Sequence, residues 1–348
     1  MTTKQVLPYS SELVCLSGSG LEVLINPERG GDILSILHKE SSQNILWNSR
    51  KAKKQRPSPG PMNLSPDSFY DEYPGGIQEL FPNTAESTLI MGAELPFHGE
   101  ACRVSWNLDE LDREEKNELK LSTVLQRSPI QMMKTISVEK KDSSLTLRSK
   151  VKNLSLASLP YSWGFHPAFG EALSSGGCTV YLPCEEMFVH PESFSSHQKY
   201  EPRSKQSLKM VGSVGEYSAR TDKDFGADLL YFRCTEGWMI ARNHISGLTI
   251  TLTWDIERMP FVWFWQEFYD PTGYPWWGLE SIIGLEVHSS APAQELKSLA
   301  DKGEASILGP HQTLEAHLTL GITFTDISKR PVGVNAKGFP ILEGDDYE

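Results

Sequence analysis

Polar and apolar residues alternate with a period of two through much of this chain of 348 residues. In residues 249–254, threonines occupy the odd positions and apolar side chains the even ones, which predicts a strand with one solvent-facing and one packed face. Residues 119–125, 145–151 and 314–320 repeat the alternation. Residues 261–268 are apolar on both faces and predict a central strand.

Helical periodicity is rare in the sequence. Only residues 293–300 predict a helix, with Gly303 as its C-terminal cap. The proline-rich residues 48–68 and the polar residues 190–226 predict long loops. Helices therefore contribute little to the expected fold.

Many strands, regular turns and no βαβ rhythm predict an all-β fold, a large antiparallel β-sandwich. No internal repeat divides the chain, so we expect a single domain over residues 1–348. Its core would cover about residues 12–325, followed by a C-terminal tail at 326–348.

Composition and charge narrow the function. The formal net charge of −12 disfavours a nucleic-acid partner or an anionic membrane, and suits a neutral small molecule. The N-terminus lacks an apolar signal segment, and no run of about 18 apolar residues occurs, so we expect a cytoplasmic protein. Five cysteines without a Cys-x-x-Cys pair are expected to be reduced and structural. No dinucleotide-binding or P-loop glycine pattern is present.

Residues 161–170 hold the first candidate for chemistry. The period of two puts Trp163 and Phe165 on one face of a strand and His166 on the other. Pro167 has no amide hydrogen, so the strand is expected to end at His166 and present its imidazole at a rim. Such an imidazole can serve as a proton donor; the alternative is a buried histidine that only hydrogen-bonds a carbonyl.

Glu286 is the second candidate, in the mostly apolar residues 281–288. Alternation puts Glu286 and His288 on the face opposite to the packed one. The carboxylate either faces water or is partly desolvated in a cleft, where its pKa would rise. Upstream, Trp276 and Trp277 offer aromatic faces for the C–H side of a pyranose, although they fit a core equally well.

Other side chains are candidates for binding hydroxyl groups or rings. Residues 73–83 are dense in proline, glycine and aromatic residues, which predicts a loop folded over a cleft. His98 is a second candidate histidine, next to a glycine that permits close backbone approach. The candidate binding residues are Gln78, Glu79, Asn83, Trp163, Gln266, Glu267 and Trp277.

These motifs, taken in order, resemble the aldose 1-epimerase (galactose mutarotase) family. The motifs are the glycine-rich residues 27–35, His98-Gly99, residues 165–169 (Phe-His-Pro-Ala-Phe) and residues 284–286 (Gly-Leu-Glu). The similarity extends from about Leu21 to about Phe324. It implies a single large β-supersandwich, no cofactor, and interconversion of the α and β anomers of an aldose by acid–base ring opening.

The resemblance also implies roles for individual residues. His166 would be the general acid that protonates the ring oxygen, and Glu286 the base that takes the proton from the anomeric hydroxyl. His98 would match a second histidine that holds the ring. Asp228 would match an aspartate that binds sugar hydroxyls, and Asp224 is nearly as good a match.

The sequence departs from the family pattern at three places. Ala168 stands where the family commonly has a tyrosine, residues 75–83 contain no arginine, and His288 replaces the usual glutamine after the base. The acid–base pair is intact. The departures indicate a divergent branch and leave the sugar, and whether it is phosphorylated, open.

Three other interpretations remain. A metal enzyme would use His98, Glu100, His166 and His288 as ligands, but no His-x-His spacing supports it and no metal is expected. A non-catalytic carbohydrate-binding protein would use the same aromatic and polar groups without turnover. A glycoside hydrolase needs two carboxylates, and only Glu286 has a persuasive setting. The expected partner is a small sugar, and the chain is expected to be a monomer or a homodimer.

Overall fold

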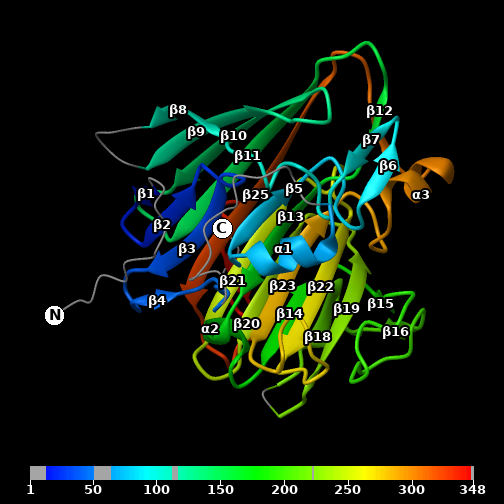
Figure 1. Cartoon of the computed structure of the whole chain (residues 1–348). Helices are drawn as coiled ribbons and strands as arrows, with labels where there is room; N and C mark the ends of the chain where they lie inside the picture. Colours follow the sequence, from blue (N-terminus) through cyan, green and yellow to red (C-terminus); the bar gives the residue numbers. More distant parts are fainter. Residues whose placement is uncertain (1–12, 51–63, 112–116, 222, 346–348) are drawn as a thin grey trace.

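The computed structural model describes residues 13–50, 64–111, 117–221 and 223–345. Two large antiparallel sheets pack face to face, so the predicted all-β sandwich is confirmed. In Figure 1 the first sheet faces the viewer, with helix α1 in front of it. Most of the predicted loop at 48–68 lies outside the described residues.

The first sheet has 11 strands in the described part of the chain. In spatial order they are β1 (Val14–Ser17), β2 (Leu21–Asn26), β3 (Asp32–His38), β5 (Ile77–Leu80), β13 (Gly164–Phe169), β23 (Ser281–His288), β22 (Phe261–Phe268), β19 (Gly226–Arg233), β15 (Glu186–Val189) and β16 (Lys205–Ser207), with β4 (Gln43–Asn44) paired to β3. The predicted central strand at 261–268 is therefore confirmed as β22.

The second sheet has 10 strands among the residues that the structure describes. They are β17 (Lys209–Val211), β18 (Val214–Ser218), β14 (Cys178–Leu182), β20 (Trp238–Asn243), β21 (Leu248–Trp254), β25 (Thr313–Phe324), β11 (Ser144–Asn153), β10 (Ile130–Val138), β9 (Glu118–Val124) and β8 (Asn107–Leu111). Strands β16, β17 and β18 all lie within the predicted loop at 190–226, so that prediction is wrong in part.

Three two-stranded sheets and three helices complete the fold of the described residues. The small sheets pair β6 (Thr88–Ile90) with β7 (Ala93–Leu95), β12 (Leu159–Tyr161) with β24 (Ser306–Leu308), and β26 (Pro331–Val334) with β27 (Pro340–Leu342). The helices are α1 (Pro66–Glu72), α2 (Glu171–Ser174) and α3 (Leu296–Asp301), of which only α3 was expected. Among the described residues, no helix is both long and apolar enough to span a bilayer.

The core lies between the two sheets. Apolar side chains on alternate strand positions meet there, for example Ile36 and Leu285 from the first sheet and Leu147 and Leu252 from the second. Burying such a side chain contributes about 1.5–3 kcal/mol, which stabilises the sandwich. All five cysteines are free, as predicted.

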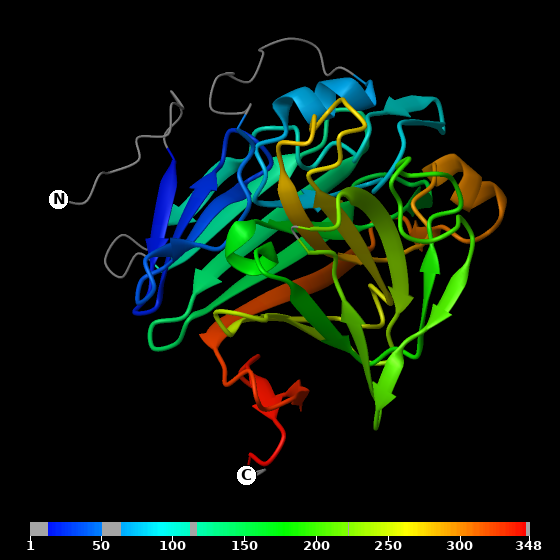
Figure 2. The same cartoon turned by 90° about the horizontal axis from the view of Figure 1, so that it is seen from below.

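The C-terminal segment covers part of the outer face of the second sheet. Arg242 of β20 donates to the carbonyls of Asp326 and Lys329, and the hydroxyls of Thr249 and Thr325 hydrogen-bond at 2.7 Å. Thr249 and Thr251 of β21 are buried and Thr253 is half-buried, so the predicted solvent-facing threonine face is wrong at its first two positions. Figure 2 shows this segment, in red, outside the sheet.

Candidate active site

The sheet register brings His166 and Glu286 together. Phe165 of β13 lies opposite Val287 of β23. The next residues along these antiparallel strands, His166 and Glu286, therefore also lie opposite each other. Their side chains leave the same face of the sheet, and the Nε2 atom of His166 is 3.4 Å from Oε1 of Glu286.

Strand β13 does not end at His166, contrary to the prediction. It continues through Pro167 to Phe169. Pro167 lies opposite Ile77 of β5, and pairing with β23 resumes at Ala168. A proline removes only its own amide donor, so one pairing is interrupted while the flanking ones hold the strand. The imidazole therefore projects from the middle of a central strand and not from a rim.

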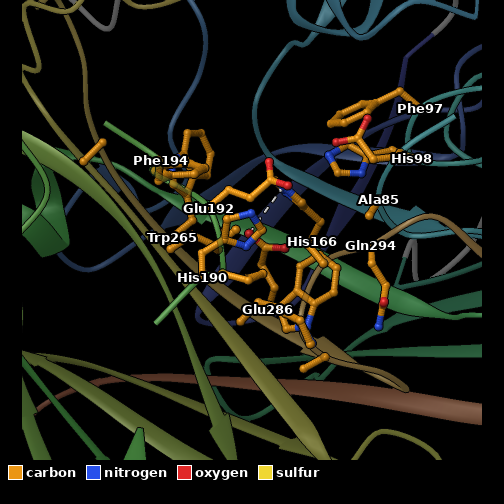
Figure 3. Close-up of a pocket in the computed structure, with 18 of the residues that line it drawn as sticks. Ala85, Phe97, His98, His166, His190, Glu192, Phe194, Trp265, Glu286 and Gln294 are labelled. Carbon is orange, nitrogen blue, oxygen red and sulfur yellow. Dashed lines mark ion pairs between the residues drawn. The ribbon is translucent and has the colours of Figure 1, made fainter. Parts of the chain in front are cut away.

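A cavity of about 1190 Å³ lies on this outer face of the first sheet. His98, His166 and Glu286 line it together, which places all three predicted catalytic residues in one cavity (Figure 3). Because β22 alternates its residues between the core and the cavity, Phe261, Trp263 and Trp265 face this cavity. The aromatic residues of the lining are Phe69, Tyr70, Tyr73, Phe97, Phe194, Phe261, Trp263, Trp265, Tyr274 and Trp276.

Helix α1 supplies part of the cavity wall. Ser65 caps its N-terminus by accepting a hydrogen bond from the amide of Ser68, and Pro66 occupies the first helical turn. The helix directs Phe69 against His98, with ring centroids 4.6 Å apart and the rings nearly perpendicular. Tyr73 follows the helix, and its hydroxyl is 3.2 Å from Nδ1 of His166.

His98 is oriented by the backbone of a neighbouring loop. Its Nδ1 lies 2.7 Å from the carbonyl oxygen of Thr84, so the ring hydrogen is on Nδ1 and Nε2 is left as an acceptor. The centroid of the ring is 5.5 Å from that of His166. His98 has φ of 63° and Gly99 of 75°, a left-handed turn that lets Gly99 pack against the carbonyls of Phe81 and Asn83.

Burial disfavours the charged form of all three groups. Desolvation lowers the pKa of His166 to about 4 and lowers the pKa of His98 well below its usual value. Desolvation also raises the pKa of the Glu286 carboxyl well above its usual value. At neutral pH the shared proton therefore favours Glu286 over His166, although either group can hold it.

The structure places two of the predicted binding residues between the sheets. Trp163 donates from Nε1 to Oε1 of Glu79, at 3.0 Å. The other carboxylate oxygen of Glu79 accepts from Ser149 at 2.9 Å and lies 3.2 Å from Nζ of Lys134. Alternation directs both side chains to the core face, so neither Glu79 nor Trp163 lines the cavity.

Gln78 and Asn83 hold loops in place and do not line the cavity. Gln78 is opposite His166 in the register, but its amide donates to the carbonyl of Gly75 and to Asp32. The Asn83 amide donates to the carbonyls of Glu86 and Pro96, at 2.9 and 2.8 Å. The predicted loop at 73–83 is wrong in part, because residues 77–80 form strand β5; of this stretch, Tyr73 lines the cavity.

Asp228 and Gln266 contact Arg220 and do not line the cavity. Asp228 forms a buried ion pair with Arg220 at 2.5 Å and accepts from the amide of Lys199. Gln266 accepts from the amide of Arg220 and donates to Tyr217. The alternative aspartate, Asp224, is exposed and accepts from the hydroxyl of Thr221. None of these three candidates lines the cavity.

Trp277 is also outside the cavity. Its side chain is 61% exposed, whereas its neighbour Trp276 is buried and lines the cavity. Trp276 packs against Trp265, with ring centroids 5.6 Å apart, and edge-on against Trp47. The aromatic pair at 276–277 is therefore divided between cavity and solvent.

Three cavity residues on β22, Phe261, Trp263 and Trp265, were missed, whereas Glu267, predicted together with Gln266 as a hydrogen-bonding residue, does line the cavity. Trp263, Trp265 and Glu267 share one face by alternation, and the register places Trp263 opposite Glu286. The predicted Gln266 is on the other face. The loop residues His190, Glu192 and Phe194 also line the cavity, and no sequence pattern marked them.

The metal interpretation gains no support from the geometry. Among the described residues, no group of three histidine, cysteine, aspartate or glutamate side chains is arranged to hold a metal ion. Glu100 accepts hydrogen bonds from the amides of Gln126 and Arg127 and from the hydroxyl of Ser128. Its carboxylate therefore fastens a turn.

No protein-family model matches the sequence, and no curated protein matches it. Solved structures do match over most of the chain. The Slr1438 protein from Synechocystis sp. PCC 6803 matches with a TM-score of 0.67 and 17% identity, over 93% of this chain and 100% of that chain.

Two further matches carry a descriptive name. A galactose mutarotase-like protein from Clostridium acetobutylicum has a TM-score of 0.63 and 14% identity, over 89% of this chain and 95% of that chain. A galactose mutarotase-like protein from Lactobacillus casei ATCC 334 has a TM-score of 0.57 and 15% identity, over 89% of this chain and 100% of that chain. At these identities the likeness shows the fold, which is galactose mutarotase-like.

Proposed function

We propose that this chain is a cofactor-independent isomerase that interconverts the α and β anomers of an aldose. The observation that carries the proposal is the contact between His166 and Glu286, 3.4 Å apart in a cavity lined by aromatic side chains. The galactose mutarotase-like fold agrees with this chemistry. His98 is the third residue of the proposed catalytic set.

Ring opening needs two proton transfers. Glu286, as carboxylate, takes the proton from the anomeric hydroxyl, while the His166 imidazolium gives its proton to the ring oxygen. The bond between C1 and the ring oxygen breaks, and an open-chain aldehyde forms between neutral His166 and protonated Glu286. After rotation about the C1–C2 bond, the reverse transfers close the ring on the other face of C1.

The reactive ion pair differs from the neutral pair by the position of one proton. Burial favours the neutral pair, since it lowers the pKa of His166 and raises that of Glu286. Hydroxyl groups of a bound sugar can hydrogen-bond both ions and so favour the ion pair. The two forms are therefore interconvertible without exchange with solvent.

The other lining groups position the sugar. Nε2 of His98 accepts from a sugar hydroxyl, since its Nδ1 hydrogen is bound by Thr84. The rings of Trp263, Trp265 and Trp276 offer apolar faces to the C–H side of a pyranose. These contacts replace the ones that we predicted for Trp163 and Trp277.

The charge of the cavity favours an uncharged sugar over a sugar phosphate. Acidic residues dominate the lining, and the basic residues there already have partners: Arg203 donates to the carbonyl of Pro191, and Lys302 to Gln294. A phosphate would meet net negative charge. The acidic residues of the lining are Asp67, Glu86, Glu192, Glu267, Asp270, Glu286, Glu295 and Glu304.

Glycoside hydrolysis fits less well. Glu267 is a second acid in the cavity, but the register places it opposite Ile282, four residues from Glu286 along β23. At a rise of about 3.4 Å per residue the two positions are about 14 Å apart along the strand. The paired carboxylates of glycosidases are about 5–9.5 Å apart.

Polarimetry on freshly dissolved α-anomers of neutral aldoses and their 6-phosphates tests the proposal. We expect a neutral aldose to equilibrate faster than the blank, and His166→Asn or Glu286→Gln to lower the rate by about 10²- to 10⁴-fold. His317→Asn and Glu315→Gln, both on β25 of the other sheet, are the matched controls. Saturable sugar binding without faster equilibration would instead show a carbohydrate-binding protein.

A further inference from the structure

Glu286 lies between two imidazoles. Its Oε1 is 3.4 Å from Nε2 of His166, and its Oε2 is 3.0 Å from Nε2 of His288. His288 is two residues further along β23 and leaves the same face. Each carboxylate oxygen thus meets a different histidine, and only His166 lines the cavity.

The His288 ring is held firmly. It is fully buried and stacks on the indole of Trp263, with ring centroids 3.7 Å apart and planes 13° apart. On its other side lies Gly164 of β13, where even a methyl group would overlap the Nδ1 and Cε1 atoms. A ring confined in this way keeps its Nε2 aimed at Glu286.

The surroundings of His288 also decide which nitrogen carries the hydrogen. Nδ1 has no hydrogen-bond partner among the described residues, whereas Nε2 is within hydrogen-bond distance of the carboxyl. Burial lowers the pKa of His288 well below its usual value, so the ring is neutral and carries one hydrogen. The pairing is satisfied only if Nε2–H donates to Oε2 of Glu286.

This hydrogen bond distinguishes the two carboxyl oxygens. Oε2 is occupied as an acceptor, so Oε1 is the oxygen that faces His166 and is left to exchange a proton. At the far side of His166, the hydroxyl of Tyr73 is 3.2 Å from Nδ1. A phenol hydroxyl both donates and accepts, so Tyr73 can follow either protonation state of His166.

We propose that His288 is a positioning residue that fixes the Glu286 carboxyl and reserves Oε1 for proton exchange with His166 and the sugar. The inference rests on the proposed function for its kinetic consequence. The Nε2–H tautomer of His288 and its hydrogen bond to Oε2 of Glu286 do not depend on turnover.

Two substitutions separate positioning from packing. His288→Gln keeps an N–H donor at a similar reach, and His288→Leu fills the space without one. We expect His288→Leu to lower kcat by about 10- to 100-fold with KM changed less than about twofold, because the carboxyl remains but its aim is lost. His288→Gln should restore most of the rate. His317→Leu on β25 is the control for loss of a histidine.

Nitrogen-15 NMR of histidine-labelled protein gives a readout that needs no sugar. We expect His288 in the wild type to show a protonated Nε2 and an unprotonated Nδ1 near pH 7, and the carboxyl of Glu286 to titrate at higher pH in His288→Leu than in the wild type. The Nδ1–H tautomer, an imidazolium, or full kcat in His288→Leu would each overturn the inference. If the wild type equilibrates no sugar, the proposed function fails, and the tautomer and titration measurements still decide the role of His288.

Discussion

Gly284 gives the sharpest test of the proposed geometry. It lies on β23 two residues before Glu286, on the same face, and opposite Trp265 of β22. A Cβ added at Gly284 would be 2.8 Å from Oε1 of Glu286 and 3.1 Å from Cβ of Trp265. Since the glycine does not have a positive φ, Gly284→Ala changes the space and leaves the backbone unstrained.

The structure sets the size of the displacement. Ordinary van der Waals contact begins at 3.4 Å, so Oε1 would move by 3.4 minus 2.8, about 0.6 Å, in order to clear the methyl group. The carboxyl cannot move as a whole, because His288 holds Oε2 at 3.0 Å. We expect a loss in kcat of about 10- to 100-fold from misplacement of the base. Overpacking against Trp265 would cost about 1–3 kcal/mol of stability.

Polarimetric kinetics and thermal unfolding measure the two effects. Gly333→Ala is the matched control, since a Cβ there would meet only Cδ1 of Ile341, at 3.9 Å. In a double-mutant cycle, Gly284→Ala should cost little further rate in a Glu286→Gln background, since the base is already lost. An unchanged kcat in Gly284→Ala, or equal losses in both backgrounds, would refute the argument that Oε1 is the proton-accepting atom.

Three further predictions follow from the buried polar groups. The rate plotted against pH should be bell-shaped. Below about pH 4, His166 and Glu286 are both protonated and no base remains, and above the raised pKa of Glu286 no acid remains. A flat profile would contradict the shared proton. Burial raises the pKa of Glu267 to about 8, whereas in the unfolded chain this carboxyl ionises near its ordinary value of 4.5. Ionisation in the unfolded chain therefore destabilises the fold increasingly as the pH rises from 4.5 to about 8. In thermal unfolding, Glu267→Gln should stabilise the protein by about 1 kcal/mol or more at pH 8 and have no effect at pH 4. Trp163→Phe removes the hydrogen-bond donor to Glu79 and should lower the free energy of unfolding by about 1.5–3 kcal/mol, measured with denaturant. The KM for sugar should stay unchanged. A large rise in KM would instead restore Trp163 as a binding residue.

Several of the predicted binding residues project from the wrong face of their strand. Glu79, Trp163 and Gln266 are polar or aromatic residues close in sequence to cavity residues, which made them plausible ligands. One position along a strand separates the cavity face from the core face. The sequence could not show which face of the aromatic strand β22 is inward, because both faces are apolar.

The sequence alone could predict the features that depend on the geometry of a single strand. Alternation predicted the all-β class, the central strand β22 and the faces from which His166 and Glu286 project, because a strand reverses its side chains at every residue. The proton-transfer roles came from the residue types and from the resemblance to aldose 1-epimerases. These inferences need only a few neighbouring residues.

Tertiary structure decided everything that depends on pairing over long distances in the chain. The register of β13 against β23 is what brings His166 to Glu286, and the same pairing presses His288 against Glu286 and Trp263. The loops that close over the outer face then remove these groups from water and shift their pKa values. Strand partners and burial arise from the free energy of the whole packed chain, so no short stretch of sequence contains them.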